Sequence, residues 1–193
     1  MNASIYMTDI PRQRPTLVLM AGFGGSGKTT LAHALAARLK WPVLDKDVLK
    51  AQIIRTCDDI SEEVASRLAY ELLFAQAQDF LMLQSLSVIL DTSAVYPAVT
   101  TSARRLMQMA DAHLKIILCK ANTHTRRLRL QQRNERDAGR RQLLINLSVL
   151  GEDNWQCFDH LPLEHLIELD TIQPFEEYLQ KALHYLNEDC TIL

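Results

Sequence analysis

Short apolar runs alternate with segments of helical periodicity along most of the chain. Apolar runs bounded by turn residues predict buried strands at residues 16–21, 43–45, 87–91, 114–119 and 165–169. Apolar residues at helical spacing predict helices from Thr29 to about 41, and over 47–57, 61–84, 97–111, 123–134 and 174–187. Strands that are apolar throughout and alternate with helices indicate an α/β fold, with a parallel sheet covered on both faces.

The alternation of strands and helices is interrupted at the N-terminus and near residue 135. Residues 1–14 carry Pro11, are followed by Pro15 and show no apolar stripe, so they predict an N-terminal tail before a single domain at 15–193. ERDAGRR at 135–141 predicts a loop, and QLLINLSVLGEDNW at 142–155 predicts a return to helix. The chain shows no internal repeat and no linker that would divide it into two domains.

Composition narrows the class of protein. The chain has 193 residues, 48% of them apolar, and a formal net charge of -2, which supplies no bulk attraction to nucleic acid or to an anionic membrane. No apolar run approaches the roughly 18 residues of a membrane span. The four cysteines lie far apart in sequence and predict free thiols in a reducing, cytoplasmic setting. A monomer and a homodimer are both compatible with this composition.

Four of the six glycines fall within GFGGSGKT, between the first predicted strand and helix. The stretch matches G-x-x-x-x-G-K-[ST], in which backbone N–H groups and a helix N-terminus hold a nucleotide triphosphate. The lysine of the motif contacts the β- and γ-phosphates, and the hydroxyl of the serine or threonine that follows it ligates Mg²⁺. ATP and Mg²⁺ are therefore the expected cofactors, with GTP not distinguished from ATP. The predicted nucleotide-binding residues are Gly22, Gly24, Gly25, Ser26, Gly27, Lys28, Thr29 and Thr30.

With this motif, residues 16–186 resemble the small P-loop kinases. The chain looks most like the branch that holds chloramphenicol phosphotransferase and the kinase domains of polynucleotide kinases, a branch that also carries the AAA-family ATPase name. The resemblance implies a five-stranded parallel sheet in the order 2-3-1-4-5. It also implies ATP·Mg²⁺ at the carboxyl edge of the sheet, and a short arginine-rich lid at roughly 126–141.

LDKDVLK at 44–50 is the second matching stretch. By resemblance, Asp47 contacts the acceptor hydroxyl and Lys50 helps to hold the acceptor. Phosphoryl transfer needs such a carboxylate to orient and deprotonate the attacking hydroxyl. Two alternatives remain: Asp47 could cap a helix that begins at Val48, or Asp45 could be the base. The family often has arginine where Lys50 stands, and lysine lacks the bidentate fork, so a phosphate-bearing acceptor is less favoured.

SVILDTS at 87–93 is the third match, because a buried strand ends in Asp91. This carboxylate is expected at the carboxyl edge of the sheet, where it would act on Mg²⁺. By resemblance, Thr92, Ser93 and Tyr96 face the acceptor. The alternative is a hydroxyl-capped turn that leads into the helix at Pro97.

Arginines dominate residues 126–141 and give the fourth match. A lid arginine would stabilise the negative charge that spreads over the transferred phosphoryl group. Arg133 and Arg136 are chosen because they lie where the predicted helix gives way to the loop. Most of the other arginines are expected on a solvated face or as ion-pair partners of Glu135 and Asp137. The predicted catalytic residues are therefore Lys28, Asp47, Arg133 and Arg136.

Together these stretches predict an ATP- and Mg²⁺-dependent kinase that transfers a γ-phosphoryl group to a hydroxyl of a small molecule. A polynucleotide 5′-hydroxyl kinase is an alternative, which would need a basic channel leading to Asp47. A nucleotide-dependent switch or ATPase without an acceptor is another, and it predicts that Asp47 faces no pocket. A fold that binds nucleotide only as structure is the least favoured, because Lys28, Thr29 and Asp91 are all intact.

Overall fold

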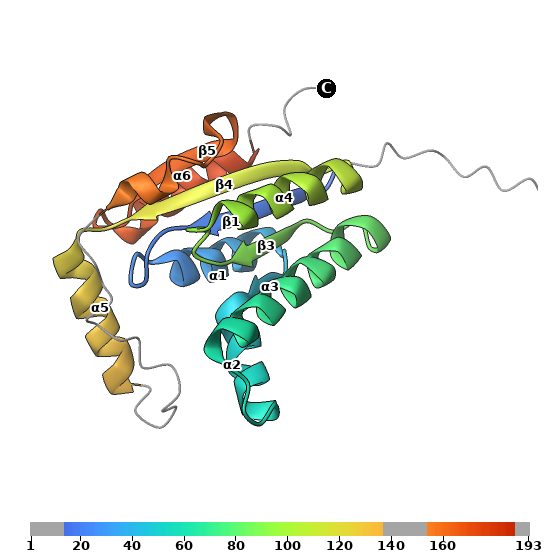
Figure 1. Cartoon of the computed structure of the whole chain (residues 1–193). Coiled ribbons are helices and arrows are strands. Elements are labelled where there is room, and N and C mark those ends of the chain that lie inside the picture. Colours follow the sequence, from blue (N-terminus) through green and yellow to red (C-terminus); the bar gives the residue numbers. More distant parts are fainter. Residues whose placement is uncertain (1–13, 137–153, 188–193) are drawn as a thin grey trace, which may run out of the picture.

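A five-stranded, all-parallel sheet forms the centre of the molecule (Figure 1). The computed structural model describes residues 14–136 and 154–187. The strands are β1 (Thr16–Ala21), β2 (Val43–Asp45), β3 (Val88–Asp91), β4 (His113–Lys120) and β5 (Leu166–Asp170). Their order in the sheet is β2-β3-β1-β4-β5, and every neighbouring pair is parallel. The predicted α/β class and strand order are confirmed.

Six α-helices connect these strands within the described residues. They are α1 (Lys28–Leu39), α2 (Lys46–Thr56), α3 (Glu62–Gln78), α4 (Pro97–Ala110), α5 (Thr123–Arg136) and α6 (Phe175–Asn187). A π-helical turn, η1 (Asp79–Leu83), extends α3, and two short 3₁₀ helices, η3 (Trp155–Phe158) and η4 (Leu163–His165), precede β5. None of the described helices is both long enough and apolar enough to span a membrane.

Two apolar clusters lie on opposite faces of the sheet. Leu17 and Leu19 of β1 face one cluster, which also contains residues of α3 and α4. Val18 and Met20 of the same strand face the other, together with residues of α1 and α6. Successive side chains of a strand point to opposite faces, so a strand covered on both sides must be apolar at every position. This explains why β1 is a continuous apolar run rather than an alternating one.

The start of α2 and the end of α5 differ from the sequence prediction. Helix α2 begins at Lys46, one residue early, because the Asp45 carboxylate caps it by accepting hydrogen bonds from the backbone N–H of Asp47 at 2.8 Å and of Val48 at 3.2 Å. The prediction that Asp47 could cap this helix is therefore wrong. Helix α5 continues through Arg136, so the predicted loop does not begin at 135. Residues 1–13, the rest of that loop and positions 142–153 of the predicted helix lie outside the described residues.

The turn between β1 and α1 is pressed closely against the rest of the protein. Gly25 has φ +76°, and a Cβ atom there would lie 2.6 Å from the carbonyl oxygen of Arg126 at the start of α5. A Cβ atom on Gly22, with φ +131°, would lie 2.4 Å from the carbonyl oxygen of Cys119 in β4. Both values are well inside van der Waals contact, so these two glycines are required by the neighbouring backbone as well as by the backbone angles.

Replacing Gly25 with alanine should therefore destabilise the protein. A Cβ atom in the left-handed region costs about 1–3 kcal/mol, and the contact with Arg126 adds to this cost. Gly24→Ala is the matched control, because its Cβ would meet only Leu130 Cδ1, at 3.9 Å. We expect chemical denaturation to show a loss of at least about 1 kcal/mol for Gly25→Ala and a change within about 0.5 kcal/mol for Gly24→Ala. Equal losses for the two variants would contradict the proposed close approach.

Candidate active site

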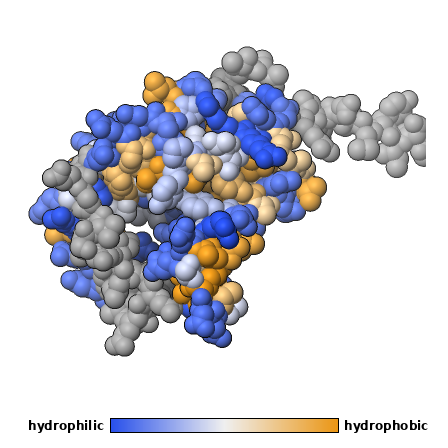
Figure 2. All heavy atoms as spheres, in the orientation of Figure 1, coloured by the Kyte–Doolittle hydropathy of each residue, from blue (hydrophilic) through white to orange (hydrophobic). Residues whose placement is uncertain are grey.

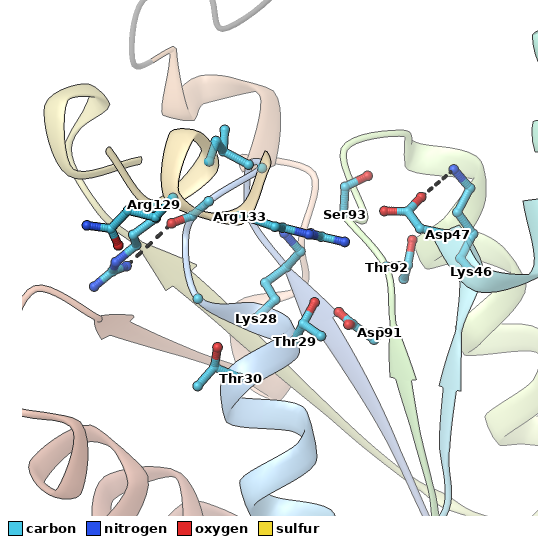
Figure 3. A pocket seen from close by; sticks show the side chains of 15 residues that line it. Lys28, Thr29, Thr30, Lys46, Asp47, Asp91, Thr92, Ser93, Arg129 and Arg133 are labelled. Atoms are coloured by element: carbon cyan, nitrogen blue, oxygen red, sulfur yellow. Dashed lines mark hydrogen bonds and ion pairs between the residues drawn. The ribbon is translucent and has the colours of Figure 1, made fainter. Parts of the chain in front are cut away.

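A cavity of about 590 Å³ opens at the carboxyl edge of the sheet (Figure 3). Its walls come from the β1–α1 turn, the end of β3, the start of α2 and the inner side of α5. The lining residues are Gly24, Gly25, Gly27, Lys28, Thr29, Thr30, Lys46, Asp47, Asp91, Thr92, Ser93, Arg129, Leu130, Gln132 and Arg133. Most of the residues predicted from the nucleotide-binding motif are thus in one place, together with Asp47, Asp91 and Arg133.

The floor of this cavity is the turn that leads into α1. Gly27, with φ +91°, is the residue before the helix, so the first N–H groups of α1 point toward the cavity. The Lys28 side chain folds back across the turn and donates a hydrogen bond from Nζ to the carbonyl oxygen of Phe23 at 2.9 Å. Desolvation lowers the pKa of Lys28, while the nearby Asp91 carboxylate acts in the opposite direction. These groups together can hold a phosphate chain.

Gly22 and Ser26, also predicted from the motif, do not line the cavity and instead support it from behind. The Gly22 N–H donates to the carbonyl oxygen of Ser93 at 3.0 Å, which ties the β1–α1 turn to the segment after β3. Ser26 is fully buried, and its carbonyl oxygen accepts a hydrogen bond from the Thr171 hydroxyl at 2.7 Å. Both residues therefore fix the shape of the turn.

Asp91 and Thr29 lie side by side at the base of the cavity (Figure 3). Asp91 is only 5% exposed, and this burial raises the pKa of its carboxyl group. A hydrogen bond with Thr29 and the charge of Lys28 oppose that rise. The described part of the chain has no group of three or more His, Cys, Asp or Glu residues that could by itself hold a metal ion. A carboxylate and a hydroxyl beside a phosphate site nevertheless suit Mg²⁺, which takes few protein ligands and completes its shell with phosphate and water oxygens.

Asp47 projects into the same cavity from the first turn of α2. Its side chain is 60% exposed and forms an ion pair with Lys46, with Nζ and Oδ1 3.2 Å apart. Asp45, the alternative base, does not line the cavity, because its carboxylate accepts the two capping hydrogen bonds of α2. The geometry therefore favours Asp47 as the carboxylate that meets a ligand.

The predicted acceptor-facing residues divide between two cavities. Thr92 and Ser93 line the cavity that holds Asp47. Lys50 and Tyr96 line a second cavity between α2, α3 and α4, and Lys50 Nζ is 2.9 Å from Glu62 Oε2. The lysine next to Asp47 is Lys46, which sequence reasoning missed. The signal was available, because Lys46 directly precedes Asp47 in the sequence.

The arginines of α5 correct another expectation. Arg133 lines the cavity, and the side chain of Arg136 lies outside the described structure. Arg126 was expected on a solvated face, but it is 2% exposed, and its guanidinium lies 4.6 Å from the ring centroid of Phe23. Arg126 Nε also donates to the carbonyl oxygen of Gly24 at 3.1 Å.

Arg129 lies on the same side of α5 and is partly buried. Its guanidinium donates to the Thr171 hydroxyl at 3.0 Å and to the Thr171 carbonyl oxygen at 2.7 Å. Positions 126, 129, 130 and 133 share one helical face, and this spacing could have shown from the sequence that α5 turns a single side toward the nucleotide-binding turn.

Proteins of known structure share this architecture at low sequence identity. A candidate kinase from Chloroflexus aurantiacus J-10-fl superimposes with a TM-score of 0.69 and 22% identity, over 91% of this chain and 97% of that chain. A gluconokinase from Sinorhizobium meliloti 1021 gives 0.61 and 16%, over 90% and 93% of the two chains. The Mycobacterium tuberculosis APS kinase CysC in complex with AMPPNP and APS gives 0.63 and 17%, over 91% and 99%. Similarity at this level establishes a common fold.

Sequence comparison adds the family. No curated protein matches the chain significantly. The AAA domain family matches residues 17–149, more than half of the chain, a range that includes the nucleotide-binding turn, Asp47 and Asp91. The resemblance to chloramphenicol phosphotransferase and polynucleotide kinases stays a prediction. The chain belongs to the AAA domain family, and its sheet has the strand order of its P-loop kinase neighbours.

Proposed function

We propose that this protein is an ATP- and Mg²⁺-dependent kinase that transfers the γ-phosphoryl group to a hydroxyl of a small molecule. The observation that carries the proposal is that Asp47 shares one cavity with Lys28, Thr29 and Asp91. A protein that only bound nucleotide would not need this carboxylate, whereas a reaction at the γ-phosphorus needs a group that orients the attacking oxygen.

The nucleotide end of the reaction rests on the β1–α1 turn. Backbone N–H groups at the start of α1 hold the phosphate chain, and Lys28 exchanges its hydrogen bond with Phe23 for the phosphate oxygens. Thr29 and Asp91 hold Mg²⁺, which neutralises charge on the phosphates when it is bound. Arg133, on the opposite wall, stabilises negative charge on the group in transfer. Thr30 lines the same cavity, and Arg136 stays the second candidate for this charge-stabilising role.

The acceptor end rests on Asp47. The acceptor oxygen forms a bond to the γ-phosphorus while the bond between that phosphorus and the β,γ-bridging oxygen breaks, which leaves ADP. Asp47 accepts the hydroxyl proton and later releases it to water. Lys46 holds the Asp47 carboxylate through their ion pair, and Thr92 and Ser93 line the path of the incoming hydroxyl.

Two further observations favour a small acceptor over a polynucleotide. The cavity that adjoins Asp47 through α2 contains three glutamates, where a nucleic acid would need a basic channel. The structural neighbours include a gluconokinase and an APS kinase, whose names denote small-molecule substrates. A nucleotide switch without an acceptor is disfavoured because Asp47 faces the cavity.

Asp47→Asn should separate transfer from nucleotide binding. We expect phosphate transfer from γ-labelled ATP to fall by about 10²–10⁴-fold, because the amide cannot accept the proton. Affinity for AMPPNP, measured by calorimetry, should stay within a few-fold of the unmodified protein. The acceptor panel would contain sugars, nucleosides, aminoglycosides, phenicols and a 5′-hydroxyl oligonucleotide.

Asp58→Asn is the matched control for that experiment, because Asp58 is an exposed carboxylate near the other end of α2 and outside the cavity. It should leave transfer unchanged. Slow ATP hydrolysis that is identical in Asp47→Asn and in the unmodified protein, without transfer to any acceptor, would overturn the kinase proposal.

The buried Asp91 should make apo-protein stability depend on pH. Its pKa is raised on folding by desolvation, although Thr29 and Lys28 oppose the rise and Asp45 and Asp47 reinforce it. The folded state then binds the proton more tightly than the unfolded state. The resulting penalty is absent below about pH 4, grows as the pH rises through the raised value, and is complete above it.

Asp91→Asn removes this titration and keeps the size of the side chain. We expect the free energy of unfolding of the variant, relative to the unmodified protein, to increase from about pH 4 toward neutral pH in the absence of nucleotide. The Mg²⁺-dependent part of nucleotide affinity should fall by about 10–100-fold. A stability difference that does not change with pH would show that Asp91 carries no desolvation penalty.

A further inference from the structure

A second cavity, of about 850 Å³, lies beyond Asp47 between α2, α3 and α4. Its lining residues are Lys50, Glu62, Glu63, Ser66, Arg67, Tyr70, Glu71, Phe74, Tyr96, Ala98, Val99 and Ser102. Figure 2 shows hydrophobic side chains gathered on the surface near α2 and α3. The mechanism above assigns no role to this space.

The two cavities adjoin one another. Helix α2 contributes Asp47 to the first and, one turn later, Lys50 to the second. Tyr70 Oη, from the second cavity, is hydrogen-bonded to Thr92 Oγ1, from the first, at 3.0 Å. Lys46 Nζ, beside Asp47, lies 5.3 Å from the ring centroid of the same tyrosine. The two cavities therefore meet at Tyr70 and Thr92.

One wall of this cavity is aromatic. Tyr70 and Phe74 come from one face of α3, and Tyr96 precedes α4, where its side chain is 64% exposed. Exposed aromatic side chains beside a cavity offer large, rigid apolar area and favour a flat apolar partner. Val99, almost fully buried, closes the wall between them.

The charged side chains that line this cavity do not balance. Lys50 is paired with Glu62 at 2.9 Å, and Arg67 Nε lies 4.0 Å from Glu71 Oε1. The hydrogen bond from Lys50 also lowers the pKa of Glu62, so this carboxylate stays ionised. Among the described residues Glu63 has no ion-pair partner, so the lining of this cavity has one more carboxylate than it has cations. Lys50, the residue that would otherwise attract an anionic acceptor, is neutralised by its partner.

We propose that the second cavity holds the phosphoryl acceptor and selects a cationic alcohol with a flat apolar body, while it disfavours anionic alcohols. Glu63 meets the ammonium group, and Tyr96 and Phe74 cover the apolar body. That the bound alcohol is the phosphoryl acceptor rests on the proposed kinase function. The selectivity is a property of binding and can be measured without nucleotide.

The glutamates could instead serve only the helix. Glu62 and Glu63 occupy the first turn of α3, where carboxylates stabilise the N-terminus, and Ser61 Oγ caps the helix by accepting a hydrogen bond from the Val64 N–H at 3.2 Å. That role alone would leave ligand binding independent of Glu63, so the two explanations predict different results.

Three probes that share a phenyl carbinol and differ in charge test the proposal: phenylethanolamine, phenylethylene glycol and mandelate. Their affinities for the full chain are measured by ligand-observed NMR without nucleotide. We expect phenylethanolamine to bind about two- to five-fold more tightly than the glycol, which is the range for an exposed ion pair, and mandelate to bind most weakly. Mandelate binding as tightly as the amine would overturn the inference.

Variants locate the selectivity. Glu63→Gln should bring phenylethanolamine to the affinity of the glycol, whereas Tyr96→Ala should weaken all three probes alike. Glu177→Gln, on the exposed side of α6, removes the same charge far from the cavity and should change nothing. A preference for the amine that survives Glu63→Gln would assign these glutamates to the helix alone. Transfer from ATP to the bound probes is scored separately, so a failure there would count against the kinase proposal and leave the binding result intact.

Discussion

The close contact between the nucleotide-binding turn and the backbone around it is the constraint on which the rest of the site depends. Carbonyl oxygens of β4 and of α5 approach the turn so closely that side chains at Gly22 and Gly25 are excluded. Thr171, directly after β5, holds the Ser26 carbonyl from the remaining side. The turn is thus fixed by three elements before any ligand arrives, and a preorganised turn binds phosphate without the cost of ordering it.

The same contact sets the position of α5. Arg126 is buried against Phe23 and Gly24, and Arg129 is tied to Thr171 one turn later. A buried guanidinium is stable only when its donors are satisfied, so these contacts allow α5 few other orientations. Arg133 lies one further turn along this face and lines the cavity. Its distance from the phosphate site is therefore determined by the arginines that precede it.

The sequence predicted most where the physical cause is local. Continuous apolar runs identified the strands because both sheet faces are covered, and the glycine motif identified the turn because its conformation demands those residues. Roles that depend on tertiary contacts were missed. The cap of α2 is Asp45 rather than Asp47 because the helix begins one residue earlier than predicted. The burial of Arg126 and the pairing of Lys50 with Glu62 depend on residues that are distant in the chain.

Charge is divided unequally between the two cavities. Lys28, Lys46 and Arg133 face the first cavity, where a nucleotide brings several negative charges. The second cavity has more carboxylates than cations, so a polyphosphate is repelled from it. Aromatic side chains there offer little to a phosphate and much to an apolar body. Helix α2 links the two cavities, because its Asp47 lines the first and its Lys50, one turn later, lines the second.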